Sequence, residues 1–215
     1  MKFKNLLSLG AMLSCGLVAQ AQVPVFHESF EAAQNKQPTD VGYYEEINKE
    51  ENDEWSIVDG GAVGKCFNFF NSTDVLNPDN FWRRAVKFRN LPLEAGKSYR
   101  LSFRFKGSNT YSNGETDVKA KMRVGLMQGV ENADISILGA NVDKDQYREV
   151  SYFNPNAYET YNLMYYFADK AKQDAEYDKQ CADKEVYAEA NKDKYFATFN
   201  VFNPGDYCLD EVELV

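Results

Sequence analysis

Aromatic side chains on a protein surface can stack against the apolar face of a sugar ring while neighbouring polar groups bind its hydroxyls. Three residues are candidates for that chemistry: Tyr111, Trp82 and Trp55. Tyr111 lies in a polar segment without apolar neighbours, which predicts an exposed ring. Trp82 shares a strand face with Val86 and Phe88, so burial in a core is the alternative for it and for Trp55.

Basic residues are concentrated in one segment of an acidic chain. Residues 83–123 contain eleven Lys and Arg against three acids, a net charge of +8, whereas the whole chain of 215 residues has a net charge of −9. Arg104 and Arg123 alternate with apolar residues, so both point outward from their strands. If these strands share a sheet, the side chains form a cationic stripe that suits uronate or sulfate. The alternative is cross-strand pairing with acids. The overall acidity argues against nucleic acid as a partner.

The sequence lacks the residue combinations that most catalytic sites require. His27 is the only histidine, and it falls on an expected strand, where a lone histidine is usually structural. Residues 59–66 superficially resemble a phosphate-binding loop, but Asp59 replaces its first glycine and Cys66 its Ser or Thr, which predicts a turn into a strand. No motif places two carboxylates across a cleft as a glycosidase requires. We therefore expect that the protein is not an enzyme.

The N-terminus has the features of a secretory signal peptide. Residues 1–21 begin with two lysines, continue with an apolar stretch and end in Ala-Gln-Ala. The apolar stretch is shorter than the roughly 20 residues that a membrane span needs. We expect cleavage after Ala21, one domain over 22–215, and a secreted, periplasmic or cell-surface protein without a membrane span. Lipid attachment at Cys15 is the alternative.

Three cysteines follow the predicted signal peptide: Cys66, Cys181 and Cys208. Their spacing contains no Cys-x-x-Cys pair, so the sequence offers too few suitably spaced ligands for a zinc or redox site. We expect them to be buried small side chains on strands, and one internal disulfide is the alternative.

Alternating apolar and polar residues predict the strands that would position these side chains. Residues 99–106 place four apolar side chains on one face, and 119–126 repeat the pattern. Further strands are expected at 26–30, 65–70, 81–88, 147–153, 195–202 and 207–214. The acidic segment 45–54 predicts a solvated loop. Residues 168–194, rich in Ala, Lys and acids, predict a helical insertion near 157–194. Tyr158, Tyr161 and Tyr165 at its start have helical spacing, but residues 163–167 fit a strand equally well. About eight antiparallel strands make an all-β sandwich.

The last expected strand changes phase along its length. Tyr207 and Leu209 point one way by alternation, whereas Val212 and Leu214 point the other way, which predicts a bulge at 210–211. A bulge leaves carbonyls unpaired and exposes a carboxylate, and oxygen ligands of this kind are those that Ca²⁺ prefers.

Two stretches carry a family resemblance: LEAGKSYRLSF at 93–103 and NPGDYCLDEVEL at 203–214. They resemble the jelly-roll carbohydrate-binding modules of the galactose-binding-domain-like type, and the likeness spans residues 26–214. The resemblance implies a jelly-roll sandwich, and a structural calcium ion held by a first-strand carboxylate, here Glu31, and a last-strand carboxylate, here Asp210. The alternative is that both acids meet solvent or lysine.

These features together predict a secreted, non-catalytic carbohydrate-binding module whose partner is a polysaccharide or other glycan. The alternative is a structural or adhesion domain of a larger cell-surface protein, which binds other domains or surface proteins. A flat apolar patch larger than a few hundred Å² would favour this alternative.

Overall fold

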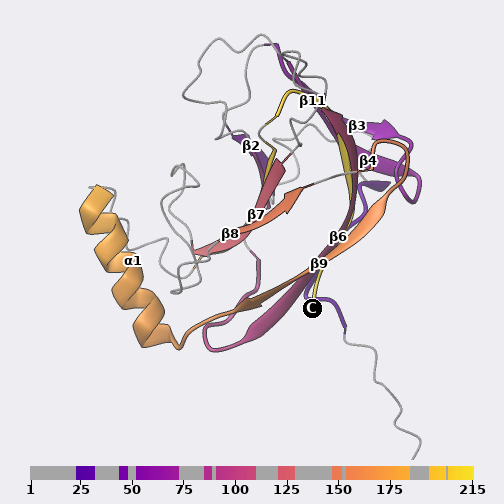
Figure 1. Cartoon of the computed structure of the whole chain (residues 1–215). Helices are drawn as coiled ribbons and strands as arrows, with labels where there is room; N and C mark the ends of the chain where they lie inside the picture. The colour runs from indigo at the N-terminus through magenta and orange to yellow at the C-terminus, as the bar shows by residue number, and fades with distance from the viewer. Residues whose placement is uncertain are drawn as a thin grey trace, which may run out of the picture.

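The computed structural model of the protein describes residues 23–31, 44–47, 52–72, 85–88, 91–109, 121–128, 147–151, 154–184, 194–201 and 203–215. These residues form two antiparallel β-sheets that face each other, with a helix beside them (Figure 1). The predicted all-β sandwich is therefore confirmed. None of the helical segments among these residues is long and apolar enough to cross a membrane.

The six-stranded sheet is built around strand β11. Its order is β3 (Glu54–Asp59), β4 (Lys65–Asn71), β11 (Gly205–Leu214), β6 (Ser98–Asn109) and β9 (Glu159–Tyr166), and β1 (Phe26–Glu28) also pairs with β11. The first half of β11 pairs with β4, its end pairs with β1, and its other edge pairs with β6 along most of its length. The two ends of the folded chain therefore lie next to each other in this sheet.

A bulge in β11 lets both halves of the strand bury their apolar residues. The register with β6 shifts between Asp210 and Glu213, and Glu211 has a left-handed φ of 48°. The four apolar residues that the alternation placed on opposite faces are all 0% exposed: Tyr207, Leu209, Val212 and Leu214. The predicted bulge at 210–211 is confirmed.

The five-stranded sheet has β10 (Tyr195–Val201) at its centre. Its order is β2 (Tyr44–Ile47), β5 (Ala85–Phe88), β10, β7 (Lys121–Gln128) and β8 (Tyr147–Ser151). β10 is antiparallel to both β5 and β7.

The core between the sheets is rich in aromatic rings. Phe103 of the six-stranded sheet meets Phe199 of the five-stranded sheet edge-on, with ring centroids 5.1 Å apart, and Phe199 meets Phe88 at 5.8 Å. All three rings are 0% exposed. Tyr165 on β9 is also fully buried, and its hydroxyl donates a hydrogen bond to the carbonyl of Val124 on β7, 2.8 Å away. Apolar burial between two layers thus holds the sandwich together.

The expected helical insertion near 157–194 is wrong in its first part. Residues 170–184 form the helix α1 (Lys170–Lys184), but residues 159–166 form β9. Tyr161 and Tyr165 are spaced like residues on one helix face, yet with Leu163 they also share one face of a strand. The strand forms because β6 provides a paired edge and a core for these side chains, which outweighs local spacing.

Two strands lie where the sequence predicted a loop at 45–54. β2 covers Tyr44–Ile47, and β3 begins at Glu54. Both are edge strands of their sheets. An edge strand tolerates acidic residues, because one of its sides has no strand partner and charge there also discourages pairing between molecules.

Candidate functional site

The three predicted aromatic platforms do not come together in the structure. Trp82 and Tyr111 lie outside the described residues. Trp55 is only 6% exposed, its ring contacts Phe69 edge-on at 5.3 Å, and its indole N–H donates to the side-chain oxygen of Asn71 at 2.9 Å. The structure therefore corrects the expectation for Trp55, because a ring whose faces are packed in the core cannot stack on a sugar.

The outer face of the five-stranded sheet carries buried polar side chains. Lys87 on β5 and Thr198 and Asn200 on β10 are 3%, 0% and 2% exposed, although their neighbours along each strand fill the core. We call these three residues, with Phe196 and Arg123, the polar face. Burying a polar side chain is costly unless it has a partner. Lys87 and Asn200 have partners within the protein, so the cost falls on Thr198.

Thr198 lies at the centre of the polar face. It is opposite Lys87 on β5 and opposite Gly125 on β7, which has no side chain. The Thr198 hydroxyl has no hydrogen-bond partner in the described part of the chain. The ammonium group of Lys87 lies 4.3 Å from the centroid of the Phe196 ring, a cation–π contact that compensates part of its burial.

Acidic residues occupy the register positions opposite both cations of the polar face. Lys87 is opposite Glu45 on β2, and Arg123 is opposite Glu149 on β8. Opposite charges at facing positions of a sheet balance each other. The register therefore favours cross-strand pairing over a cationic surface here.

Arg104 lies on the other sheet. It is an exposed residue of β6 in the six-stranded sheet, whereas Arg123 is an exposed residue of β7 in the five-stranded sheet. The condition for the cationic stripe, that both strands belong to one sheet, is therefore not met, because the basic segment 83–123 contributes strands to both sheets.

Exposed apolar side chains on the six-stranded sheet are far apart. Phe70 is 40% exposed and lies on β4, whereas Met164 and Tyr166, 42% and 63% exposed, lie on β9. Strands β11 and β6 separate the two groups. In the described part of this sheet they do not form the continuous apolar patch that an adhesion surface would need.

The two predicted calcium ligands do come together, on either side of the turn that joins β3 to β4. A main-chain oxygen of this turn, that of Gly64, accepts hydrogen bonds from the N–H groups of Gly60 and Gly61 at 2.9 Å. Glu31 Oε1 accepts from the N–H of Lys65 at 2.6 Å, and Asp210 Oδ2 accepts from the N–H of Val63 at 3.0 Å. The segment 59–66 is therefore a turn into a strand, as predicted.

Glycine residues in this turn allow both carboxylates to approach the backbone. A Cβ atom on Gly64 would collide with the Glu31 carboxylate, and one on Gly61 would lie 2.8 Å from Asp210 Oδ2. Gly64 also has a left-handed φ of 60°. The donor chemistry fits a hard cation, since two carboxylates converge on one turn. The described residues hold no cluster of three His, Cys, Asp or Glu side chains, so a bound cation would need further oxygen ligands of another kind, such as main-chain carbonyls.

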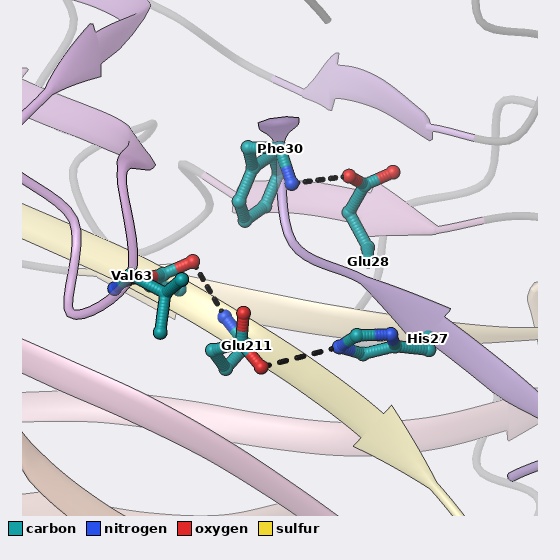
Figure 2. A network of polar contacts seen from close by, with 6 residues as sticks. His27, Glu28, Phe30, Val63 and Glu211 are labelled. Atoms are coloured by element: carbon teal, nitrogen blue, oxygen red, sulfur yellow. Dashed lines mark hydrogen bonds and ion pairs between the residues drawn. The ribbon is translucent and has the colours of Figure 1, made fainter. Parts of the chain in front are cut away.

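Polar contacts from β1 and from the bulge of β11 surround this turn (Figure 2). His27 Nε2 lies 3.3 Å from Glu211 Oε2, and the Glu28 carboxylate accepts a hydrogen bond from the N–H of Phe30. Asp210 is 0% exposed, and its Oδ1 accepts from the N–H of Glu211 at 2.7 Å. Burial raises the pKa of Asp210, and the N–H groups that bond to its carboxylate oppose that rise.

The pKa values of three titratable groups on the outer face of the six-stranded sheet are also shifted. The hydrogen bond with Cys66 lowers the pKa of Cys208 to about 6, and contacts with Asn68 and Lys106 act in the same direction. The same thiol–thiol hydrogen bond, together with burial, raises the pKa of Cys66. Burial raises the pKa of Tyr158, whose hydroxyl contacts both thiols.

The fold defines the class of protein to which the chain is similar. No protein-family model matches the sequence, and a search of the curated proteins finds no match. Among solved structures, the chain is similar over 91% of its length to a Clostridium thermocellum xylanase solved as its CBM22-1 and GH10 modules with xylohexaose (TM-score 0.50, 9% identity).

Two further structures show the same architecture. One is a tandem of CBM22 domains from Paenibacillus barcinonensis (TM-score 0.50, 9% identity, 91% of this chain). The other is a candidate sugar-binding protein from Bacteroides thetaiotaomicron (TM-score 0.52, 11% identity, 80% of this chain and 87% of that one). The chain spans only 29% of the xylanase chain and 50% of the tandem. The protein thus has the jelly-roll sandwich fold of carbohydrate-binding modules, as the sequence resemblance implied.

Sequence reasoning missed most of the polar face. The segments 81–88 and 195–202 were expected as strands, and Lys87, Thr198 and Asn200 fall on the outward positions of their alternation. Outward polar residues are normally solvated, so nothing marked these three as buried. The one available signal was their concentration on two strands, but strand pairing had to be known before it could be recognised.

Proposed function

We propose that the protein is a non-catalytic carbohydrate-binding module whose polar face binds polysaccharide. The observation that carries the proposal is the Thr198 hydroxyl, which is 0% exposed and has no partner among the described residues. A buried hydroxyl without a partner lowers stability unless a ligand supplies the missing hydrogen bond. The likeness in fold to carbohydrate-binding modules supports this proposal.

The chemistry of the polar face suits an uncharged sugar chain. Sugar hydroxyls both donate and accept, so they match the hydroxyl of Thr198, which has no partner among the described residues. Lys87 and Asn200 beside it already interact within the protein. The register places an acid opposite each of the two cations, at positions 45 and 149, which supports a neutral rather than an anionic glycan. The glycan would approach from the side of Arg123, which is exposed, and Gly125 places no side chain opposite Thr198.

A binding assay with one substitution on each sheet tests this function. Xylohexaose, the sugar in the Clostridium thermocellum structure, is the first probe, followed by neutral and acidic polysaccharides in affinity gels. We expect retention by a neutral polysaccharide and about tenfold weaker binding by Thr198→Val, which keeps the shape of the side chain and removes the hydroxyl. Thr160→Val, on the exposed outer face of β9, is the matched control and should bind like the parent. If no polysaccharide is retained, or if both variants bind equally, the proposal is wrong.

We further propose that Glu31 and Asp210 hold a structural calcium ion at the β3–β4 turn. When bound, the ion would cross-link β11, the segment after β1, and the turn by joining their oxygen atoms. A ligand that binds only the folded state stabilises it by about 2.7 kcal/mol at one hundred times its dissociation constant. We expect Ca²⁺ to raise the unfolding midpoint of the parent and a chelator to reverse the rise.

Single amide variants show whether these carboxylates are the ligands. Glu31→Gln and Asp210→Asn should each abolish the response to Ca²⁺, whereas Glu54→Gln, an exposed acid on β3, should retain it. An unfolding midpoint of the parent that is indifferent to both Ca²⁺ and chelator would exclude the ion.

Export is the remaining part of the proposal. We propose that residues 1–21 are a signal peptide, which the Lys-rich start, apolar stretch and Ala-Gln-Ala ending support. N-terminal sequencing of the protein exported by its host should begin at Gln22. A retained Met1, or a start at Cys15 with an attached lipid, would contradict this cleavage.

A further inference from the structure

Two cysteines lie beside each other on the outer face of the six-stranded sheet. Cys66 is on β4 and Cys208 is on β11, and these strands are hydrogen-bonded neighbours. Cys208 is opposite Asn68, and Cys66 lies two residues before Asn68, so the two cysteines occupy diagonal positions of one face. Their side chains contact each other, and both are free thiols.

Polar groups from two other segments hold the thiol pair in place. The Tyr158 hydroxyl donates a hydrogen bond to the carbonyl of Gly60 at 3.0 Å and contacts both thiols. The Lys106 ammonium lies 4.6 Å from the centroid of the Tyr158 ring. Asn68 Nδ2 lies 3.6 Å from Cys208 Sγ. These contacts surround the two thiols with polar groups rather than with apolar side chains.

Apolar packing does not explain this pair. A buried cysteine that serves as a small apolar side chain belongs on the inward face of a strand, where Phe67 and Leu209 lie. Cys66 and Cys208 instead share the outward face with Asn68 and Lys106. Cys208, at 9% exposed, is more accessible than Cys66, at 0%. The arrangement is that of a dithiol rather than of two packed side chains.

We propose that Cys66 and Cys208 are an oxidisable dithiol, which a small-molecule disulfide such as oxidised glutathione converts into a disulfide bond between β4 and β11. The Cys208 sulfur attacks one sulfur of the reagent, forms a mixed disulfide and expels one glutathione thiolate. The Cys66 thiol loses its proton, and its sulfur attacks Cys208 Sγ and expels the second glutathione. Two protein thiols are oxidised, and one reagent disulfide is reduced to two thiols.

The bond would connect the beginning and the end of the folded domain. It joins residue 66 to residue 208, and a cross-link that closes a long loop restricts the unfolded chain most strongly. It also lies beside the β3–β4 turn, because Cys66 follows that turn and Cys208 precedes Asp210 by two residues. The oxidised protein should therefore unfold at a higher temperature than the reduced protein.

The test uses the full chain with Cys15→Ser and Cys181→Ser, which leaves the proposed pair as its only thiols. The folded protein is incubated with oxidised glutathione, and thiol titration and intact mass follow the products. We expect both thiols to disappear together, with a mass loss of two hydrogens and no bound glutathione. A proteolytic digest should contain one peptide pair linked between Cys66 and Cys208. Dithiothreitol should restore both thiols and lower the unfolding midpoint to its original value.

Single replacements provide the matched controls. In the same background, Cys66→Ala leaves Cys208 to form a mixed disulfide that cannot resolve, so we expect one bound glutathione. Cys208→Ala leaves only the fully buried thiol, which should react more slowly. The proposal is overturned if the folded two-cysteine protein keeps both thiols under conditions that oxidise dithiothreitol, or if it accumulates a stable mixed disulfide. Neither outcome depends on polysaccharide or calcium binding, so this test is independent of the proposed function.

Discussion

The outer faces of the two sheets have opposite characters. On the five-stranded sheet, the outward side chains of Lys87 and Thr198 are 3% and 0% exposed. On the six-stranded sheet, Met164 and Tyr166 are 42% and 63% exposed although they are apolar. Polar residues are thus buried on one face while apolar residues meet solvent on the other. Stability alone would arrange them the other way, so the five-stranded sheet is the better place to look for binding.

The largest effect should come from the core that the two sheets share. Phe199→Ala removes a ring that contacts Phe88 in its own sheet and Phe103 in the other, and should reduce the free energy of unfolding by about 3 to 5 kcal/mol. Phe70→Ala, on an outer face and 40% exposed, should cost about 1 kcal/mol or less. Denaturant unfolding of both variants measures the difference. An equal loss of unfolding free energy in the two variants would contradict the assignment of Phe199 to the core and of Phe70 to the outer face.

A smaller loss of stability should distinguish the β3–β4 turn, which contacts Glu31, from the turn at Gly96, which has a similar backbone conformation but no such contact. Gly64→Ala and Gly96→Ala both place a side chain at a left-handed φ, 60° and 75°, which costs about 1 to 2 kcal/mol. Only at Gly64 would the new Cβ also collide with the Glu31 carboxylate; at Gly96 it meets nothing within 4 Å. Gly64→Ala should therefore be the more destabilising variant in thermal unfolding, and a loss no greater than that of Gly96→Ala would argue against the close approach of Glu31.

The smallest effect tests the polar face directly through stability. Thr198→Val removes a buried hydroxyl that has no partner among the described residues, so it should raise the free energy of unfolding by about 1 kcal/mol. Thr160→Val on the exposed face of β9 should change it by about 0.5 kcal/mol or less. A gain in stability at Thr198 together with a loss of polysaccharide binding would show that the hydroxyl is kept for the ligand. A loss of stability at Thr198 would instead show that the hydroxyl has a structural partner.

Some elements were predictable because their signal is local. The alternation in residues 99–106 predicted β6. The change of phase between Leu209 and Val212 predicted the bulge before any partner strand was known. Residues 159–166 were ambiguous, since their tyrosines fit a helix and a strand equally well. The pairing with β6 decided the outcome, and no local pattern contains that information.

The sequence by itself determined the class of fold, a helical segment before the β10 strand, the turn at 60–64 and the bulge at 210–211, because alternation and glycine spacing are short-range properties of the chain. Only the tertiary structure decided that Arg104 and Arg123 lie on different sheets, that Trp55 is in the core, and that Cys66 contacts Cys208. These outcomes depend on which strands become neighbours. Strand order is set by the burial of the whole aromatic core, to which residues from every part of the folded chain contribute.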